Sequence, residues 1–243
     1  MTPQAPTELP APLARTRLYE QVAEQITAWI RQNGLTAGDR LPPERELASR
    51  LGVSRATLSQ ALVALEVVGV VVVRHGDGTV LTGKHSESRI VEAIRAHAHR
   101  LPEIIDIRDA LETKIAALAA QRRTEEDLVA IDAALDAMEA SIQQGDRGVE
   151  ADEQFHAAVT AAAHSDLLAQ TMREIASLIR ESRIESLSQP GRPRNSLSGH
   201  RAITDAIRAR DPEVAAAAMH AHVEMVSDVA LLRGQDRDQD QDR

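Results

Sequence analysis

The chain has 243 residues, a formal net charge of −9 at pH 7, no cysteine, and 1% aromatic against 43% hydrophobic residues. The missing cysteines exclude a disulfide framework and a thiolate zinc site, no apolar run approaches the roughly 18 residues of a membrane span, and the N-terminus lacks a signal-peptide core. We therefore expect a cytoplasmic protein of one large domain or two, with cores of Ala, Leu, Ile and Val that favour close-packed helices.

The first predicted element is an amphipathic helix over Leu18–Gln32, where apolar residues recur at helical spacing. Residues 1–14 precede it, and their four prolines predict a disordered arm. The expected inner face of the helix comprises Leu18, Val22, Ile26, Trp29 and Ile30.

A helix-turn-helix pattern follows. A short helix is predicted over Glu44–Arg50, opened by Pro42 and Pro43, because a first helical turn tolerates proline. Gly52 then supplies a tight turn of the kind that joins the two helices of this motif.

The second helix of the motif is predicted to begin after Ser54, whose side chain can cap it by accepting from free backbone N–H groups. Its apolar residues share one face and pack inward. Arg55, Thr57 and Ser59 are therefore presented outward, where small polar side chains beside an arginine suit reading of the major groove.

Two short strands are predicted next, over Val70–Val73 and Thr79–Leu81. The loop between them contains His75 and Gly76 and is rich in residues that tolerate positive φ. A hairpin directly after a helix-turn-helix is typical of a wing, while an ordinary three-helix subdomain with a hairpin is the alternative.

The segment from Leu18 to Leu81 resembles the winged-helix domain of the GntR family of bacterial transcription regulators. The matching residues are Tyr19, Leu41 to Ala48 (Leu-Pro-Pro-Glu-Arg-Glu-Leu-Ala), Gly52 to Arg55 (Gly-Val-Ser-Arg), Leu62, Leu65, Gly69, Gly76 and Gly78. The resemblance implies double-stranded operator DNA as the partner. It also implies that the DNA is contacted by Arg45, Ser54, Arg55, Thr57, His75 and Gly76.

One departure from the family pattern affects the expected DNA sequence. This chain has Ser59-Gln60-Ala61-Leu62 where the family usually has Arg-Glu-Ala-Leu, so a strong guanine or phosphate contact is missing. The usual operator of the family should therefore not be assumed.

The charge distribution agrees with a local DNA-binding patch. Residues 1–82 hold eight basic and eight acidic residues, so the acidic excess lies in residues 83–243.

Beyond a polar linker at 83–88, only helical periodicity is found, which predicts an all-α bundle of six to seven helices over residues 89–232. The fold class is thus mainly α, with a winged helix-turn-helix of three helices and a β-hairpin over residues 15–82. Residues 233–243 form a low-complexity tail that we expect to be disordered. The candidate helices are 88–99, 102–122, 125–144, 147–163, 166–187, 196–209 and 212–232. Gln189 to Asn195 is expected to be a loop. The bundle resembles the FadR-type C-terminal effector (FCD) domain of the same family.

Four polar residues of the bundle are predicted to point into it. Asp152 and His156 are four residues apart on one helix face, while His200 and His222 lie on the apolar sides of two later helices. Unpaired polar burial costs several kcal/mol, so the four form either a divalent metal site or a set of buried, hydrogen-bonded histidines. One Asp and three His suit zinc first, with nickel, manganese or iron as alternatives.

The resemblance adds weight to the metal interpretation, because a metal-binding subgroup of the family has all four positions. Gly199 stands where that subgroup commonly has Glu. The other histidines of the bundle region are expected to be solvated: His85, His97, His99, His164 and His220.

Arg108 interrupts an apolar stripe of its predicted helix. It either forms an i,i+4 salt bridge with Glu112 or is held in the core as a partner for a carboxylate ligand. The resemblance implies the second role, since a family arginine at this position lines the effector cavity. Arg180 and Arg183 are further candidates whose direction the sequence leaves open.

These features predict a homodimeric, operator-binding regulator, more often a repressor in this family. A divalent metal and a small organic acid in the helical domain are expected to modulate DNA binding. The alternatives are a regulator for which the metal itself is the signal, and a metal-dependent hydrolase. Because no general base or nucleophile is identifiable, we assign no catalytic residue and expect no enzyme activity.

Overall fold

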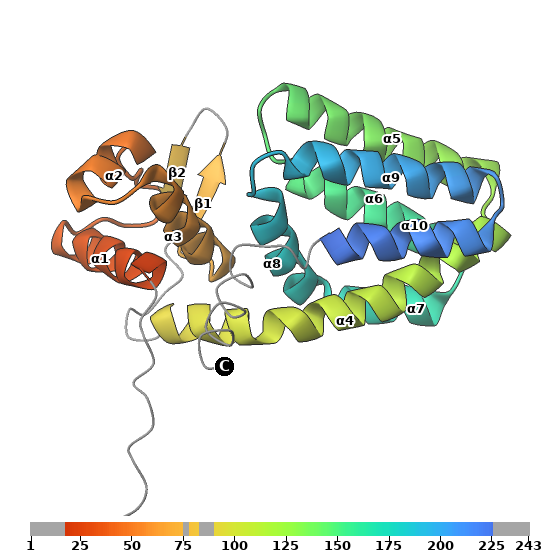
Figure 1. Ribbon diagram of the computed structural model, residues 1–243, viewed down its shortest axis with the longest axis horizontal. Coiled ribbons are helices and arrows are strands. Elements are labelled where there is room, and N and C mark those ends of the chain that lie inside the picture. The colour runs from red at the N-terminus through yellow and green to blue at the C-terminus, as the bar shows by residue number, and fades with distance from the viewer. Residues whose placement is uncertain (1–17, 75–77, 83–89, 226–243) are drawn as a thin grey trace, which may run out of the picture.

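The computed structural model describes residues 18–74, 78–82 and 90–225, in which the chain forms ten helices and one two-stranded sheet (Figure 1). The arms expected at 1–14 and 233–243, the linker at 83–88, and His75 and Gly76 lie outside the described residues. Within the described part of the chain, no helix combines the length and apolar character that a membrane crossing requires.

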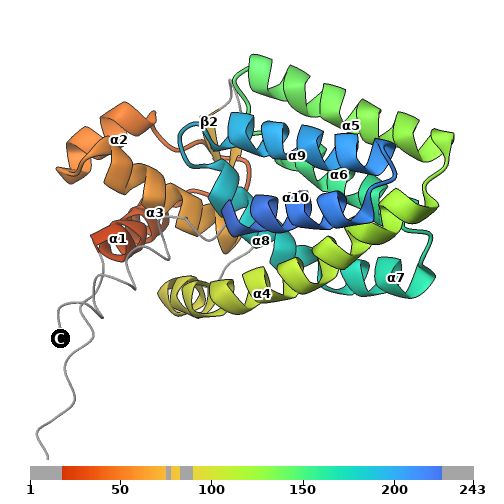
Figure 2. The ribbon, with the colours of Figure 1, turned by 45° about the vertical axis from the view of Figure 1, so that its right-hand side comes forward.

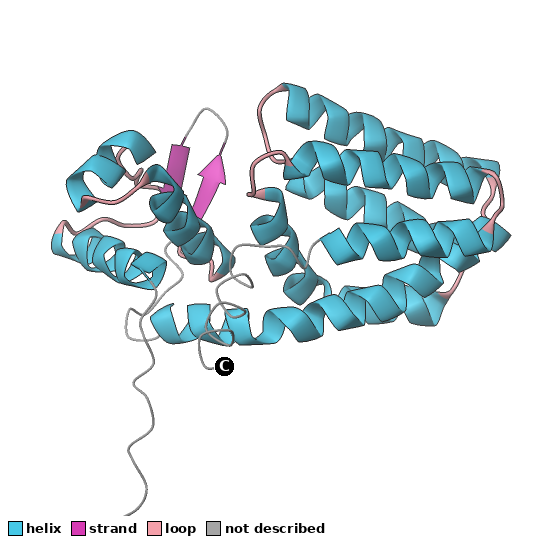
Figure 3. Cartoon of the chain, in the orientation of Figure 1, coloured by secondary structure: helices cyan, strands magenta, loops and turns pink. Residues whose placement is uncertain are grey.

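The first domain is a three-helix unit with a hairpin. Its elements are α1 (Leu18–Gln32), α2 (Glu44–Leu51), α3 (Arg55–Val67), β1 (Val71–Arg74) and β2 (Gly78–Leu81). Gly52 ends α2 in the left-handed conformation at φ 66°, which favours glycine because it has no Cβ. The strands are antiparallel, with Val71 opposite Leu81, and they are the only strands among the described residues (Figure 3).

The core of this domain differs from the predicted one at one position, Leu18. Val22 and Ile26 are buried against Leu58 and Leu65 of α3, as their spacing predicts. Leu18, however, is 56% exposed. It is the first residue of α1, and Tyr19 fills the inner face in its place.

Helix α4 (Ile90–Arg122) is a single helix of 33 residues, not the two expected over 88–99 and 102–122. Pro102 lies inside it at an exposed position. An interior proline costs about 3 kcal/mol, and buried residues on both sides, Ala98, Leu101 and Ile104, offset that cost. The early turns of α4 pack into the core of the first domain through Ile94 and Leu101, and α4 runs along both domains (Figures 1 and 2).

The second domain is an all-α bundle of seven helices in the described residues. It comprises α4 together with α5 (Glu125–Gln143), α6 (Val149–Ala162), α7 (Asp166–Glu174), α8 (Ala176–Leu187), α9 (Arg192–Arg208) and α10 (Pro212–Glu224). Its main core is built from small and aliphatic side chains around Ile115, Ile131 and Ile203. This composition agrees with the near absence of aromatic residues.

Two expected helix bounds are wrong. The predicted helix 166–187 is broken at Ile175, whose φ of −101° and ψ of 5° are not helical, so α7 and α8 are separate. Helix α9 begins at Arg192 instead of Ser196, because Pro193 occupies its first turn, where the missing N–H is no loss. The expected loop is therefore shorter.

An ion pair joins the two domains. Arg147, which precedes α6, donates to both carboxylate oxygens of Glu66 at the end of α3, each at 2.8 Å. The same carboxylate accepts from the backbone N–H of Val73 in the hairpin at 2.9 Å. One residue of the second domain thus contacts the carboxylate that anchors both α3 and β1.

A second buried cluster connects α4 with α8. His97 is only 2% exposed, and its two ring nitrogens lie 3.0 Å from Glu181 and 3.3 Å from Glu185. The expectation that His97 is solvated is therefore wrong. His164 and His220 are exposed but pair with Asp127 and Asp109, each at 2.7 Å.

Candidate metal centre and DNA-binding surface

The N-terminal end of α3 is the exposed end of that helix. Arg55 begins it at an exposed position, and Ser54 caps it by accepting from the Thr57 backbone N–H at 3.0 Å. Ser59, one turn on, is half-buried, and from Ala61 to Val67 every residue is buried against the rest of the molecule. Helices of this motif read DNA with their N-terminal residues, which is the part of α3 that remains accessible.

Of the other residues expected to contact DNA, some lie in the part of the chain that the structure describes and two lie outside it. Arg45 lies on α2 at an exposed position, and Thr57 is half-buried with its hydroxyl 2.8 Å from that of Ser54. Ser54 and Thr57 therefore support each other at the helix start. His75 and Gly76 fall in the residues without a described placement.

Four polar residues converge in the second domain, as their helical spacing predicts. Asp152 and His156 come from α6, His200 from α9 and His222 from α10, and all four are buried. Each offers one ligand atom, and these atoms all lie within 4.8 Å of one another. Phe155 stacks on the His200 ring at 4.0 Å with 17° between the planes, which fixes the orientation of that imidazole.

The bonding pattern of the cluster fits a metal ion. Three of its buried ring nitrogens lack a hydrogen-bond partner: Nε2 of His156, and Nδ1 of His200 and of His222. Two other polar atoms meet charged side chains, with Oδ2 of Asp152 lying 2.8 Å from Arg183 and Nδ1 of His156 lying 2.9 Å from Glu112. Burial and neighbouring histidines hold the pKa values of His200 and His222 well below the usual range, so both imidazoles are neutral. Although burial opposes ionisation of Asp152, the neighbouring His156 and Arg183 side chains lower the pKa of its carboxyl group. Neutral imidazoles beside an ionised carboxylate are the ligand forms that a divalent transition metal requires.

Gly199 gives a physical reason for one departure from the family pattern. A Cβ atom at this position would lie 2.9 Å from Nδ1 of His222, closer than packed atoms approach. The α10 imidazole therefore occupies space beside α9 that any side chain at position 199 would invade. Glycine at position 199 avoids this contact, and a larger residue would require the His222 side chain to shift.

A shell of buried charges surrounds the candidate ligands. Arg108 donates to Glu112 at 2.9 Å and to Ser182 at 3.2 Å, and Glu112 lies 2.9 Å from Nδ1 of His156. The i,i+4 pair considered for Arg108 is thus the one that the structure contains. The sequence does not predict the contact between Glu112 and His156, because it joins α4 to α6 and no local sequence pattern indicates it.

The structure distinguishes the two arginines of α8. Arg183 is buried, with Nε 2.8 Å from Oδ2 of Asp152. Arg180 is half-buried and pairs with Glu150 and Glu153. Burial lowers the pKa of Arg183, and the charge of Asp152 opposes this effect only in part.

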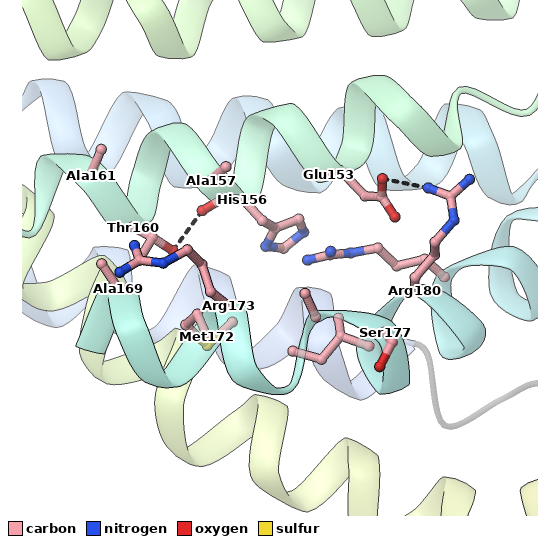
Figure 4. A pocket seen from close by; sticks show the side chains of 13 residues that line it. Glu153, His156, Ala157, Thr160, Ala161, Ala169, Met172, Arg173, Ser177 and Arg180 are labelled. Atoms are coloured by element: carbon pink, nitrogen blue, oxygen red, sulfur yellow. Dashed lines mark hydrogen bonds and ion pairs between the residues drawn. The ribbon is translucent and has the colours of Figure 1, made fainter. Parts of the chain in front are cut away.

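A cavity of about 510 Å³ lies beside the cluster, between α6, α7 and α8. His156 and Arg183 line it, so the candidate metal centre and the buried guanidinium share one wall. Figure 4 shows His156, Met172 and Arg180 around this space, with Glu153 paired to Arg180 at its edge. A small molecule in the cavity would have access to a candidate ligand residue and to a buried cation.

The sequence matches two family profiles in the order of the two domains. Residues 18–81 match "Bacterial regulatory proteins, gntR family", and residues 103–225 match "FCD domain". The FCD profile alone spans about half of the chain.

Known proteins resemble the chain over most of its length. It is 35% identical over 221 residues, 86% of this chain and 85% of the other, to an Escherichia coli (strain K12) protein whose name assigns it a predicted role in regulating an L-lactate dehydrogenase operon. It is 32% identical over 208 residues to the HTH-type transcriptional regulator LutR of Bacillus subtilis (strain 168), covering 82% and 95% of the two chains. Among solved structures, Streptococcus agalactiae GntR matches with a TM-score of 0.46 and 26% identity over 86% of this chain and 98% of that one.

Proposed function

Because this chain belongs to the GntR family and is a DNA-binding transcription regulator with an FCD domain, not an enzyme, we propose that it is controlled by a divalent metal and a small carboxylic acid. The residues proposed to hold the metal are Asp152, His156, His200 and His222. Zinc is the first candidate, with nickel, manganese or iron as alternatives. The observation that carries this proposal is the convergence of these buried side chains, three of whose ring nitrogens lack a hydrogen-bond partner, beside a cavity.

Charge balance supports an anionic effector. Four ionised side chains lie in and around the cluster, and their charges cancel: Arg108 and Arg183 against Glu112 and Asp152. A divalent cation would add two positive charges to this buried region, where uncompensated charge costs several kcal/mol. A carboxylate beside Arg183 would offset part of that charge. Arg183 is therefore the principal effector-binding candidate, while Arg108 remains a proposed one through its position behind Glu112.

The DNA-binding role is proposed for residues 15–82, with the effector-binding and dimerisation role for residues 89–232. Two copies would present two α3 helices to half-sites about one helical turn apart. The side chains proposed at the DNA are Arg45, Ser54, Arg55, Thr57 and Ser59, together with His75 and Gly76 of the hairpin loop. An effector changes DNA affinity only by binding two arrangements of the DNA-binding domains with different affinities.

Elemental analysis of the purified chain, beside its His200→Ala variant, tests the metal proposal. About one equivalent of metal per chain is expected in the parent and a large loss in the variant, because His200 is completely buried and its replacement removes a ligand. His99→Ala, at an exposed position of α4, is the matched control. Equal metal content in all three proteins would rule out the proposed ligand set.

Titration of operator binding separates the metabolite-responsive regulator from one that senses the metal. Fluorescence anisotropy with promoter fragments from the chain's own genomic neighbourhood would be recorded with metal alone and with metal plus a carboxylic acid. If the chain releases the operator DNA only when the acid is present, the proposal is supported. Full release by the metal without any acid would identify the metal as the signal.

A further inference from the structure

The cavity beside the candidate metal centre has one polar end and a long apolar wall. Its polar end is formed by His156 and Arg183. Arg183 is nine-tenths buried, its Nε is paired with Asp152 at 2.8 Å, and one further guanidinium nitrogen, Nη2, has no hydrogen-bond partner. The wall consists of Ala157, Ala161, Ala169, Met172, Ala176 and Ile179. Such a wall favours a ligand with an equally apolar body.

The alanines and Met172 of this wall offer no side-chain hydrogen-bonding group, although Arg173 and Ser177 also line the cavity. The Thr160 hydroxyl donates to the carbonyl oxygen of His156 at 2.7 Å, so its proton is already used within α6. Glu153 and Arg180 pair with each other at the edge. A polyhydroxylated acid lying along the alanines and Met172 would therefore leave hydroxyl groups unpaired there, at a cost of about 1–3 kcal/mol each.

The cavity is also large for a three-carbon acid. If each of the six non-hydrogen atoms of lactate is allowed a water's share of liquid volume, roughly 30 Å³, lactate fills about 180 Å³. That is about a third of the 510 Å³ found here. The unfilled space adjoins the alanines and Met172, where a hydrocarbon chain would displace water from apolar surface.

We propose that the effector is a monocarboxylic acid with a hydrocarbon chain or ring of roughly six to fifteen carbon atoms, within the roughly 17 non-hydrogen atoms that the cavity holds at the same allowance, and not a small hydroxy acid. This inference rests on the proposed function, because it places the carboxylate at the polar end beside Arg183. The hydrocarbon body lies between α6, α7 and α8 along the alanines and Met172. Its far end reaches the rim near Arg173 and Arg180.

Calorimetric titration of the metal-loaded full chain with straight-chain acids from acetate to octanoate, and with L-lactate, tests the inference. Each added methylene is expected to tighten binding by about fourfold, the fold-change that corresponds to burying one CH₂, until the chain reaches the rim. L-lactate is expected to bind no more tightly than acetate. A dissociation constant that does not change with chain length, or a preference for L-lactate, would overturn the inference while leaving a carboxylate-responsive regulator intact. Failure of every acid to bind would overturn the proposed function as well.

Two cavity-filling variants locate the hydrocarbon body. Ala157→Phe and Ala169→Leu each add side-chain volume to the wall, so octanoate binding is expected to weaken at least tenfold while acetate binding is retained. Ala133→Phe, at an exposed position of α5 away from the cavity, is the control and should bind octanoate like the parent. Because two independent sites are tested, misfolding of one variant does not decide the result. Unchanged octanoate binding in both folded variants would place the hydrocarbon elsewhere and overturn the inference.

Discussion

His97 connects the long helix α4 to α8, and its charge offers a direct test of how the two are held together. Burial by itself lowers the pKa of this imidazole, but the carboxylates of Glu181 and Glu185 outweigh that effect and raise the pKa to about 9. The proton is therefore held tightly in the folded chain. Replacing the residue in a His97→Gln variant removes the charge and keeps a polar side chain of similar size.

The magnitude follows from the difference between the folded and unfolded pKa values. An unperturbed histidine titrates near 6.5, and the folded value is about 9. Because the folded pKa is the higher one, protonated His97 stabilises the fold fully below about pH 6.5, and this contribution is lost as the pH rises through 9. A difference of about 2.5 pH units corresponds to about 3 kcal/mol.

Urea unfolding of the parent and of His97→Gln at pH 6, pH 7.5 and pH 9.5, at one protein concentration, measures this contribution. The stability difference between the two chains is expected to shrink by about 3 kcal/mol from the lowest to the highest pH. His99→Gln, at an exposed position of the same helix, controls for the substitution itself. A stability difference that is the same at all three pH values would refute the charged state assigned to His97.

Three further substitutions have defined expectations. Gly199→Ala should lower metal affinity about 10–100-fold, because its Cβ would press on Nδ1 of His222, and competition with a chromophoric chelator measures the change. Arg147→Met should cost about 1–3 kcal/mol of unfolding free energy, because it leaves the Glu66 carboxylate with one partner fewer at a largely buried site, and urea unfolding measures it. Arg55→Ala should weaken operator binding by about 1–3 kcal/mol, as measured by anisotropy.

Each of these expectations has a matched control. Ser198→Ala, at the exposed position next to Gly199, should retain metal affinity. A Glu66→Gln change in the Arg147→Met background should recover part of the lost stability, since it removes the stranded charge. Arg201→Ala, an exposed arginine of α9 paired with Glu139, should leave operator affinity unchanged. Parent-like behaviour of the test variants would contradict the corresponding contacts.

Local signals in the sequence predict the first domain well. The turn at Gly52 and the cap at Ser54 are both confirmed, because each is determined by residues within a few positions along the chain. Helical spacing likewise indicates that Asp152 and His222 face the bundle, and the structure brings them together with the two other candidate ligands. Their role as metal ligands stays a prediction.

Contacts between distant segments account for what the sequence could not predict. His97 meets Glu181 across 84 residues of the chain, so no periodicity identifies it as buried. Pro102 would end an isolated helix, but packing on both sides carries α4 through it. Arg180 and Arg183 are three residues apart, and only the arrangement of α6 and α8 determines that the first is half-buried and the second buried.

The continuity of α4 has a mechanical consequence. With Ile94 packed in one domain and Ile115 in the other, its 33 residues form a lever about 50 Å long. A tilt of about 5° at one end would displace the other by about 4 Å, slightly more than the 3.4 Å step between successive base pairs. If the second domain binds an effector as proposed, a tilt of a few degrees there would be enough to move α3 out of register with its half-site on the DNA.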